Sequence, residues 1–193
     1  MKARIILASA SPRRRELLDQ IGIAYDIRPV DIDESPHPDE APADYVCRIA
    51  AEKSAVCHTQ AASIGLPVLA ADTAVVLNGR IMGKPKDKED ALAMLRRLSG
   101  QTHQVYSAVS LRGNEHGEAL SVTEVTFRTL SEQEIVAYWA TSEPADKAGS
   151  YAIQGLGSVF VQSIQGSFSG VVGLPLFETA ELLLQQGIQV LHE

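Results

Sequence analysis

Apolar residues along this chain follow two periods, and their order predicts strands mixed with helices. Short apolar or alternating runs predict strands at residues 5–8, 25–30, 67–77, 80–82, 105–111, 120–128 and 159–164. Apolar stripes at helical spacing predict helices at residues 12–21, 43–62, 87–98, 131–140 and 175–186. Because both hairpins and helices join the strands, the pattern predicts an α/β fold with a mixed sheet.

Local signals predict the turns between these elements. Asn78-Gly79 is the strongest hairpin signal in the chain and joins the strand at 67–77 to a short return strand. Ser131 and Glu134 have the spacing of a capping box at a helix start. The acidic, proline-rich segment 31–40 and the segment 144–150 predict loops.

The start of the first helix contains an electrostatic conflict. Ser11 and Pro12 are typical of an N-cap and a first helical position. Arg13, Arg14 and Arg15 follow in the first turn, where the helix dipole is positive and cations are disfavoured. A bound anion, phosphate above all, would resolve the conflict through backbone N–H groups and arginine forks. The alternative is an exposed basic turn that is slightly destabilising.

Composition narrows the class of protein. A chain of 193 residues with 45% hydrophobic and 21% charged residues is typical of a soluble globular enzyme of one domain, or of one sheet with two lobes. The net charge of −7 and the 5% aromatic content argue against binding to a nucleic acid polymer. No stretch approaches a membrane span, and the N-terminus leads directly into a strand, so we expect a cytoplasmic protein. Cys47 and Cys57 lack zinc-ligand spacing and are expected to be reduced.

Candidate chemistry lies in isolated charges within apolar surroundings. Asp72 interrupts an apolar strand, so it is expected to be paired, to hold a metal or to face a cleft; a structural ion pair is the alternative. Lys53 lies on the apolar stripe of its helix, although a lysine that snorkels to water has the same pattern. Glu34 lies in an acidic loop, and such loops are usually solvated. Lys84 follows a glycine in a turn and is suited to reach an anion.

Two glycine-rich segments resemble nucleotide-binding motifs and fail them. Residues 79–85 are one residue short of a phosphate loop, and Pro85 stands where a Ser or Thr would contact magnesium. Residues 155–160 place Phe160 at the third glycine of a dinucleotide fingerprint. Gly155 and Gly157 therefore predict a sharp turn or a close approach of the backbone to a ligand.

The basic and acidic candidates together fit one reaction class. Several cations would neutralise a triphosphate, and two carboxylates would hold a hard divalent cation and activate water. This set is typical of the hydrolysis of a nucleotide phosphoanhydride. The cations are Arg13, Arg14, Lys53 and Lys84, and the carboxylates are Glu34 and Asp72.

The motifs in their order resemble the Maf family of nucleotide pyrophosphatases over essentially the whole chain, residues 1–193. The resemblance implies one domain with an elongated mixed sheet flanked by helices and a deep cleft between two lobes, as in inosine triphosphate pyrophosphatases. It also implies cytoplasmic homodimers that hydrolyse nucleoside triphosphates to the monophosphate and pyrophosphate with Mg²⁺ or Mn²⁺. The motifs are Ser9-Ala10-Ser11-Pro12-Arg13-Arg14, Asp33-Glu34, Ala51-Glu52-Lys53, Ala71-Asp72-Thr73, Gly83-Lys84-Pro85, Ser99-Gly100, Asp146-Lys147-Ala148-Gly149, Ile153-Gln154-Gly155 and residues 166–175.

The resemblance also implies residue roles. Asp72 matches the general base, and Glu34 matches a carboxylate that helps to hold the metal with Asp72. The positions that match phosphate binding are Ser9, Arg13, Arg14, Lys53 and Lys84, and those that match substrate selection are Arg13, Thr73 and Gln154. Arg15 matches no such position and is expected to be solvated.

The stretch 146–155 is closer to the dTTP/UTP branch of the family than to the 7-methyl-GTP branch. The amide of Gln154 has both a donor and an acceptor, so it can pair with the O4 and N3–H edge of thymine or uracil. The resemblance leaves two other functions open. One is the clearance of modified pyrimidine triphosphates, and the other is a nucleotide-sensing role in septum formation; RNA binding ranks last.

Overall fold

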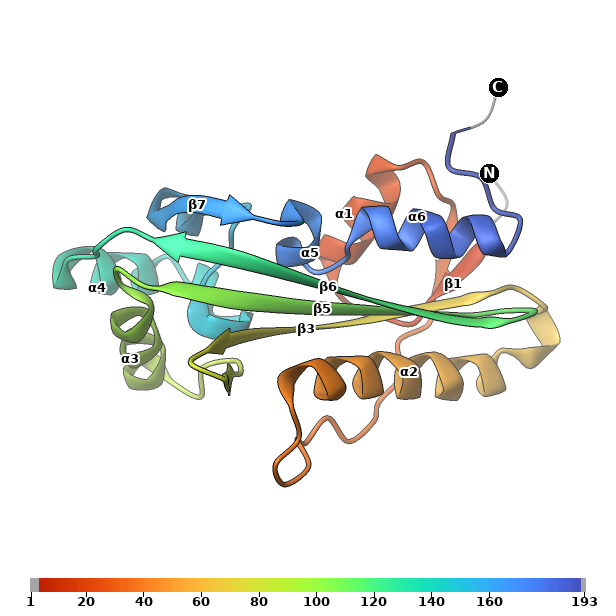
Figure 1. Cartoon of the computed structure of the whole chain (residues 1–193), viewed down its shortest axis with the longest axis horizontal. Helices are drawn as coiled ribbons and strands as arrows, with labels where there is room; N and C mark the ends of the chain where they lie inside the picture. The colour runs from red at the N-terminus through yellow and green to blue at the C-terminus, as the bar shows by residue number, and fades with distance from the viewer. Residues whose placement is uncertain (1–3, 192–193) are drawn as a thin grey trace.

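A seven-stranded mixed sheet forms the centre of the protein, seen in a computed structural model that describes residues 4–191 (Figure 1). The strand order is β2-β1-β3-β5-β6-β7. The short β4 pairs with the same edge of β3 as β1 does, but at the other end of that strand. β1 is parallel to β2 and β3, whereas the pairs from β3 to β7 are antiparallel. The strands are β1 (Ile5–Leu7), β2 (Tyr25–Ile27), β3 (Val68–Leu77), β4 (Arg80–Met82), β5 (Thr102–Arg112), β6 (His116–Phe127) and β7 (Val161–Gln165).

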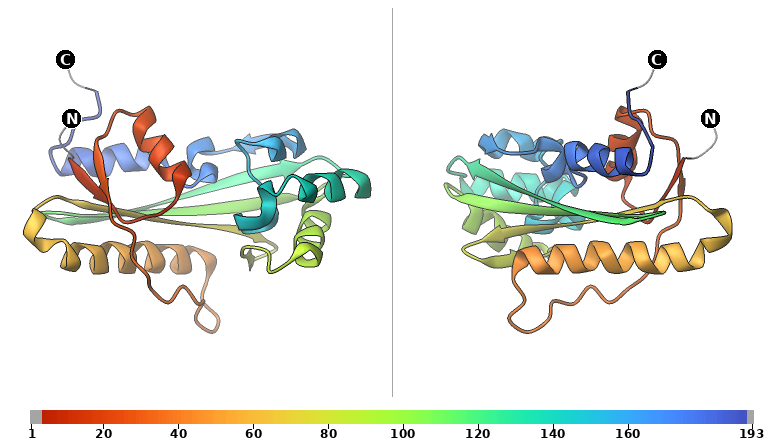
Figure 2. Two further views of the ribbon diagram at one scale, coloured as in Figure 1. Left: turned by 180° about the vertical axis from the view of Figure 1, so that it is seen from behind. Right: turned by 45° about the vertical axis from the view of Figure 1, so that its right-hand side comes forward.

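Helices cover both faces of the sheet. The long helix α2 lies on one face, and α1, α5 and α6 lie on the other, as both views in Figure 2 show. α3 and α4 pack at the far end of the long β5–β6 hairpin. The helices are α1 (Pro12–Gln20), α2 (Pro42–Gln60), α3 (Lys88–Leu98), α4 (Glu132–Ala140), α5 (Phe168–Val172) and α6 (Leu176–Gln185), with 3-10 turns at Ala62–Ile64, Glu143–Asp146, Ala148–Ser150 and Leu156–Phe160.

Strand β3 positions the candidate site. β5 pairs along one edge of β3, whereas the opposite edge is only partly paired. β1 pairs with β3 as far as Leu69, and β4 pairs with it from Val75 onward. Among the described residues, no strand pairs with residues 70–74 along that edge. Asp72 and Thr73 lie in this gap. Because successive side chains of a strand point to opposite faces of the sheet, these two side chains leave the strand on different faces.

The predicted fold class is confirmed: the structure is an elongated mixed sheet flanked by helices. The turn at Asn78-Gly79 and the capping box of Ser131 and Glu134 are confirmed as well. Within residues 4–191, no helix is long and apolar enough to span a bilayer.

Several predicted element boundaries were wrong, each for a tertiary reason. β2 ends at Ile27 rather than at residue 30 because its neighbour β1 ends at Leu7. Val159 and Phe160 belong to a 3-10 turn, so the last strand begins at Val161. The segment 144–150, predicted as loop, contains two short 3-10 turns.

Helix α5 was not predicted at all. It contains a glycine and two valines, which have low helix propensity. It is capped instead by the Ser167 side chain, which accepts a hydrogen bond from the N–H of Gly170 at 3.0 Å.

Candidate active site

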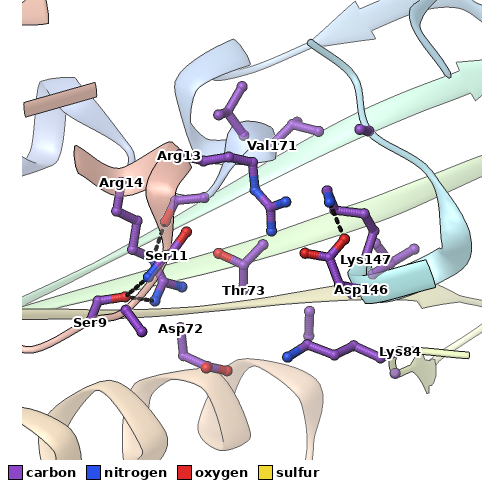
Figure 3. Close-up of a pocket in the computed structure, with 18 of the residues that line it drawn as sticks. Ser9, Ser11, Arg13, Arg14, Asp72, Thr73, Lys84, Asp146, Lys147 and Val171 are labelled. Atoms are coloured by element: carbon purple, nitrogen blue, oxygen red, sulfur yellow. Dashed lines mark hydrogen bonds and ion pairs between the residues drawn. The ribbon is translucent and has the colours of Figure 1, made fainter. Parts of the chain in front are cut away.

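A cavity of about 680 Å³ opens at the uncovered edge of β3 (Figure 3). It is large enough for a nucleotide, since ligand pockets of roughly 300–1,000 Å³ hold small organic ligands. Every site residue predicted from the sequence lines it. These are Ser9, Arg13, Arg14, Glu34, Lys53, Asp72, Thr73, Lys84 and Gln154.

The arginine-rich start of α1 forms one wall. Ser11 occupies the N-cap position, but its side chain makes no capping hydrogen bond, which corrects the expectation of a hydroxyl cap. Arg14 is held in place, because its Nε donates to the Gly173 carbonyl at 2.8 Å and its Nη1 to Ser9 Oγ at 3.1 Å. The Arg13 side chain points into the cavity (Figure 3). The start of α1 therefore brings two positive charges to the cavity. Arg14 is held by hydrogen bonds, and Arg13 points into the open space.

Opposite this wall, Lys53 lies between two carboxylates. Its Nζ is 3.0 Å from Asp72 Oδ1 and 2.8 Å from Glu34 Oε1. Lys53 and Asp72 are buried, with exposed fractions of 8% and 7%, whereas Glu34 is exposed. The alternative of a snorkelling lysine is therefore wrong. Glu34 is solvated, as acidic loops usually are, and it is also paired with Lys53. Burial raises the pKa of Asp72, while Lys53 and Arg14 oppose that rise.

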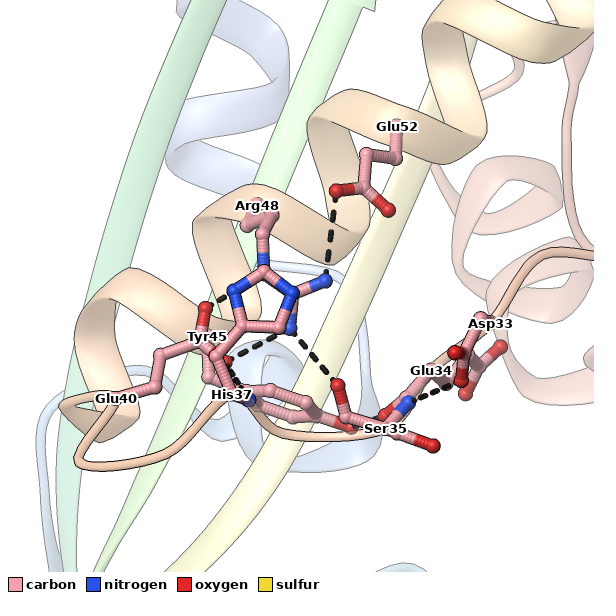
Figure 4. Close-up of polar contacts among 8 residues, drawn as sticks. All are labelled: Asp33, Glu34, Ser35, His37, Glu40, Tyr45, Arg48 and Glu52. Atoms are coloured by element: carbon pink, nitrogen blue, oxygen red, sulfur yellow. Dashed lines mark hydrogen bonds and ion pairs between the residues drawn. The ribbon is translucent and has the colours of Figure 1, made fainter.

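The loop that carries Glu34 is tied to α2 by Arg48 (Figure 4). Arg48 Nε and Nη2 donate to the two carboxylate oxygens of Glu40 at 2.6 and 2.7 Å, and Nη2 also donates to the Ser35 carbonyl at 3.1 Å. The Tyr45 hydroxyl donates to the Glu34 carbonyl at 3.0 Å. The hydrogen bonds from Arg48 lower the pKa of Glu40 to about 2. A bidentate fork of this kind holds both partners in one geometry.

We expect Arg48→Ala to lower kcat/KM by about tenfold to a hundredfold, which is typical when a group that orients a site carboxylate is lost. The reason is that Glu34 reaches Lys53 from a loop, and Arg48 anchors that loop on both sides of residue 37. Steady-state kinetics on the purified variant measure the effect.

Glu52→Gln is the matched control, because Glu52 contacts the same guanidinium at 3.4 Å and forms no hydrogen bond or ion pair with the loop residues drawn in Figure 4. Equal losses in the two variants would contradict a positioning role for the fork.

Residues 151–154 also form a wall of the cavity, called the far wall, and side chains outside the cavity hold this segment in place. The Tyr138 hydroxyl accepts from the Ala152 N–H at 3.0 Å and donates to Glu143 at 2.6 Å. Tyr151 hydrogen-bonds the buried His103 at 2.8 Å, and burial lowers the pKa of His103 to about 4, so this histidine is neutral at pH 7. Gln154 projects from this segment and is exposed.

The two glycines beyond Gln154 serve the fold rather than a ligand. Glu143 accepts from the Leu156 and Gly157 N–H groups at 2.9 and 3.0 Å. A Cβ at Gly155 would lie 2.3 Å from Glu143 Oε2, and one at Gly157 would lie 2.7 Å from the Tyr138 hydroxyl. The predicted sharp turn is present, and the close approach is to Glu143 and Tyr138.

Sequence reasoning assigned no role to three further charged or polar residues of the cavity. Tyr45 gives no signal because it lies on an ordinary helical stripe, and Asp146 and Lys147 form an ion pair in a loop that has no periodicity. With them, basic side chains outnumber acidic ones in a chain of net charge −7. The basic lining residues are Arg13, Arg14, Lys53, Lys84 and Lys147, and the acidic ones are Glu34, Asp72 and Asp146.

The donor set fits a hard divalent cation of the kind that keeps most of its water. Within residues 4–191, no group of three or more His, Cys, Asp or Glu residues could enclose a metal. Glu34 and Asp72 nevertheless direct carboxylate oxygens at one point, the Lys53 ammonium. Magnesium is usually bound by one or two carboxylates together with substrate phosphates and water, so two carboxylates facing an anion site suffice.

Fold and site together define an α/β protein with a basic-lined cavity beside a buried carboxylate. Residues 4–186 match the family described as Maf-like protein, and the chain belongs to that family. A protein of Methylococcus capsulatus named dTTP/UTP pyrophosphatase is 58% identical over 96% of this chain and 92% of its own length. Proteins of the same name from Nitrosomonas europaea and Anaeromyxobacter dehalogenans are each 54% identical, over 96% and 97% of this chain and 96% of their own lengths.

Solved structures match more distantly. The Ham1 protein of Staphylococcus aureus is 18% identical, covers 64% of this chain and 71% of its own, and has a TM-score of 0.40. A nucleoside-triphosphatase, or dITP/XTP pyrophosphatase, of Mycobacterium abscessus is 14% identical over 94% of this chain and 93% of its own, with a TM-score of 0.41. Likeness at this level carries no argument about the site.

Proposed function

We propose that this protein hydrolyses dTTP and UTP to the nucleoside monophosphate and pyrophosphate. The observation that carries the proposal is one cavity that joins the arginine-rich start of α1 to the buried pair of Lys53 and Asp72. Relatives more than 50% identical over nearly the whole chain bear the name of this activity. The basic side supports binding of a triphosphate, and the carboxylate supports activation of water.

Asp72 is the proposed general base. A water molecule attacks the α-phosphorus, its proton passes to the Asp72 carboxylate, and the bond from the α-phosphorus to the oxygen that bridges to the β-phosphorus breaks, so pyrophosphate leaves. Burial raises the pKa of Asp72, which strengthens it as a base, while Lys53 and Arg14 favour its ionised form.

The cations are proposed to bind and neutralise the triphosphate. Arg14 is held by Gly173 and Ser9 before any ligand binds, so little freedom is lost when it meets a phosphate. Arg13 and Lys84 reach the same space from opposite walls (Figure 3). Lys53 holds the base and Glu34 together, which supports an orienting role as well as a phosphate contact.

Glu34 and Asp72 are the residues proposed to hold Mg²⁺ or Mn²⁺. When bound, such an ion offsets phosphate charge and polarises the phosphoryl oxygens. Gln154 and Thr73 are proposed to contact the nucleobase of the substrate. Both residues line the cavity, and Thr73 lies near its centre in Figure 3.

Pyrophosphate release from a panel of nucleoside triphosphates, with Mg²⁺ or Mn²⁺, tests the proposal. We expect dTTP and UTP to exceed CTP and the purine nucleotides in kcat/KM by at least tenfold, because a mismatched buried hydrogen-bonding group costs about 1–3 kcal/mol. Equal values across the panel would contradict the proposed specificity, and no release from any member would contradict the activity.

We further propose one domain with two lobes, which assembles as a homodimer in the cytoplasm. Phe168, Phe177 and Leu184 expose large apolar side chains on α5 and α6, which supports an interface between copies. Analytical ultracentrifugation measures the state of assembly.

A further inference from the structure

Thr73 is connected through the sheet to the backbone of α5 by a chain of hydroxyl groups. Thr73 on β3 and Ser107 on β5 are directly opposite in the antiparallel register, and their hydroxyl oxygens are 2.9 Å apart. Ser107 is fully buried and donates to the Gly170 carbonyl at 2.6 Å. Of Thr73, Ser107 and Gly170, only Thr73 lines the cavity.

The direction of these hydrogen bonds follows from counting protons. A hydroxyl has a single proton to donate, and a carbonyl can only accept. Gly170 lies in the last turn of α5, where carbonyls lack intrahelical partners, and the N–H of Leu174 donates to Ser169 instead, at 3.0 Å. The Gly170 carbonyl therefore requires the Ser107 proton. The contact between the two hydroxyls must then be made by the proton of Thr73.

We infer that Ser107 fixes Thr73 as a hydrogen-bond acceptor toward the cavity and that this acceptor receives the N3–H of thymine or uracil. The inference rests on the proposed function and adds Ser107 to it as a positioning residue. With its proton directed at Ser107, the Thr73 oxygen offers only lone pairs to a ligand. An oxygen of this kind repels phosphate oxygens, so Thr73 serves the nucleoside and not the triphosphate.

A group that can only accept a hydrogen bond discriminates between two ligand groups only if each of them can act solely as a donor or solely as an acceptor. A sugar hydroxyl rotates and can donate or accept, whereas ring N3 of uracil and thymine always donates and ring N3 of cytosine only accepts. Gln154 does not supply this discrimination alone, because its exposed amide forms no hydrogen bond with the rest of residues 4–191 and can turn over to present either group. The hydrogen bonds from Thr73 to the buried Ser107, and from Ser107 to Gly170, deny the Thr73 hydroxyl such freedom.

The test is binding of non-hydrolysable α,β-imido analogues of UTP and CTP, measured by calorimetry. The wild-type protein should prefer the UTP analogue. Ser107→Ala releases the Thr73 proton, which can then donate to cytosine N3, so the preference should fall by about tenfold, mainly through tighter binding of the CTP analogue. An N3-methylated UTP analogue, which lacks the donor, should bind the wild-type protein about tenfold more weakly than the UTP analogue.

Matched variants separate this effect from a structural one. Ser110→Ala also removes a fully buried hydroxyl of β5, one that contacts Ser54 at 2.8 Å, and it should leave the preference unchanged. Thr73→Ser keeps the hydroxyl and should retain the preference, whereas Thr73→Val should lose it through weaker binding of the UTP analogue. Thermal unfolding verifies that each variant is folded.

The outcomes for the inference and for the proposed function are distinct. A preference that is the same in wild type and folded Ser107→Ala overturns the inference, and so does unchanged binding of the N3-methylated analogue, even when dTTP is turned over. If Thr73→Val is the only variant that folds, its unchanged preference likewise overturns the inference. A preference that responds as described supports the inference, even if the panel detects no pyrophosphate release and the proposed function fails.

Discussion

Asp72→Asn should lower kcat for dTTP by about 10²- to 10⁴-fold, the range that general-base catalysis contributes. Asparagine has the shape of aspartate but cannot take the proton of the attacking water. Glu34, the other carboxylate at Lys53, is not expected to replace the base, because it is exposed and comes from a loop. Steady-state pyrophosphate release measures kcat, and circular dichroism verifies the fold.

Asp146→Asn is the control for this variant. Asp146 is the third cavity carboxylate, but it is exposed and pairs with Lys147 rather than with Lys53. It should therefore retain kcat within a fewfold of the wild type. Substantial activity in Asp72→Asn, or an equal loss in both variants, would show that Asp72 is not the base.

Lys53→Met should lower the free energy of unfolding by about 3–5 kcal/mol, the usual result of removing one partner from a buried ion pair. Lys53 is 8% exposed and Asp72 is 7% exposed, so the carboxylate left behind has little access to water. Methionine keeps most of the side-chain volume, and the loss of stability therefore reports the missing charge. Urea unfolding at pH 7 measures it, and kcat should fall as well because the base and Glu34 lose their common partner.

Two further variants make the stability prediction specific. Lys84→Met removes an exposed lysine of the same cavity and should change stability by less than about 0.5 kcal/mol. The double variant Lys53→Met with Asp72→Asn should be more stable than Lys53→Met alone, because no unpaired charge remains buried. Additive losses in the double variant would contradict the account of Lys53 as the counter-charge of Asp72.

The conflict at the start of α1 acquires a physical explanation from the tertiary structure. Arg14 is only partly exposed, and it is held by the Gly173 carbonyl, 159 residues away in sequence, and by Ser9. Arg13 enters the cavity, whereas Arg15 does not line it. The first turn therefore separates its arginines by direction, and two of the three line the cavity.

By itself, the sequence determined the α/β class, most helices and strands, the hairpin at Asn78-Gly79 and the identity of the charged candidates. These follow from local spacing and turn chemistry, which act over a few residues. It also indicated that Asp72 requires compensation, because a bare carboxylate in an apolar strand is costly to bury. Motif order then associated the same residues with one family.

Only the tertiary structure decided which groups meet. Lys53 bridges Glu34 and Asp72, Arg48 anchors the loop of Glu34, and Ser107 orients the Thr73 hydroxyl. None of these contacts has a local signal, because the partners lie on different elements and meet through strand register and helix packing. The gap in the edge of β3 likewise depends on where β1 ends and β4 begins. Local sequence thus supplied the chemical groups, and long-range packing set their distances and hydrogen-bond directions, on which the proposed catalysis and base selection depend.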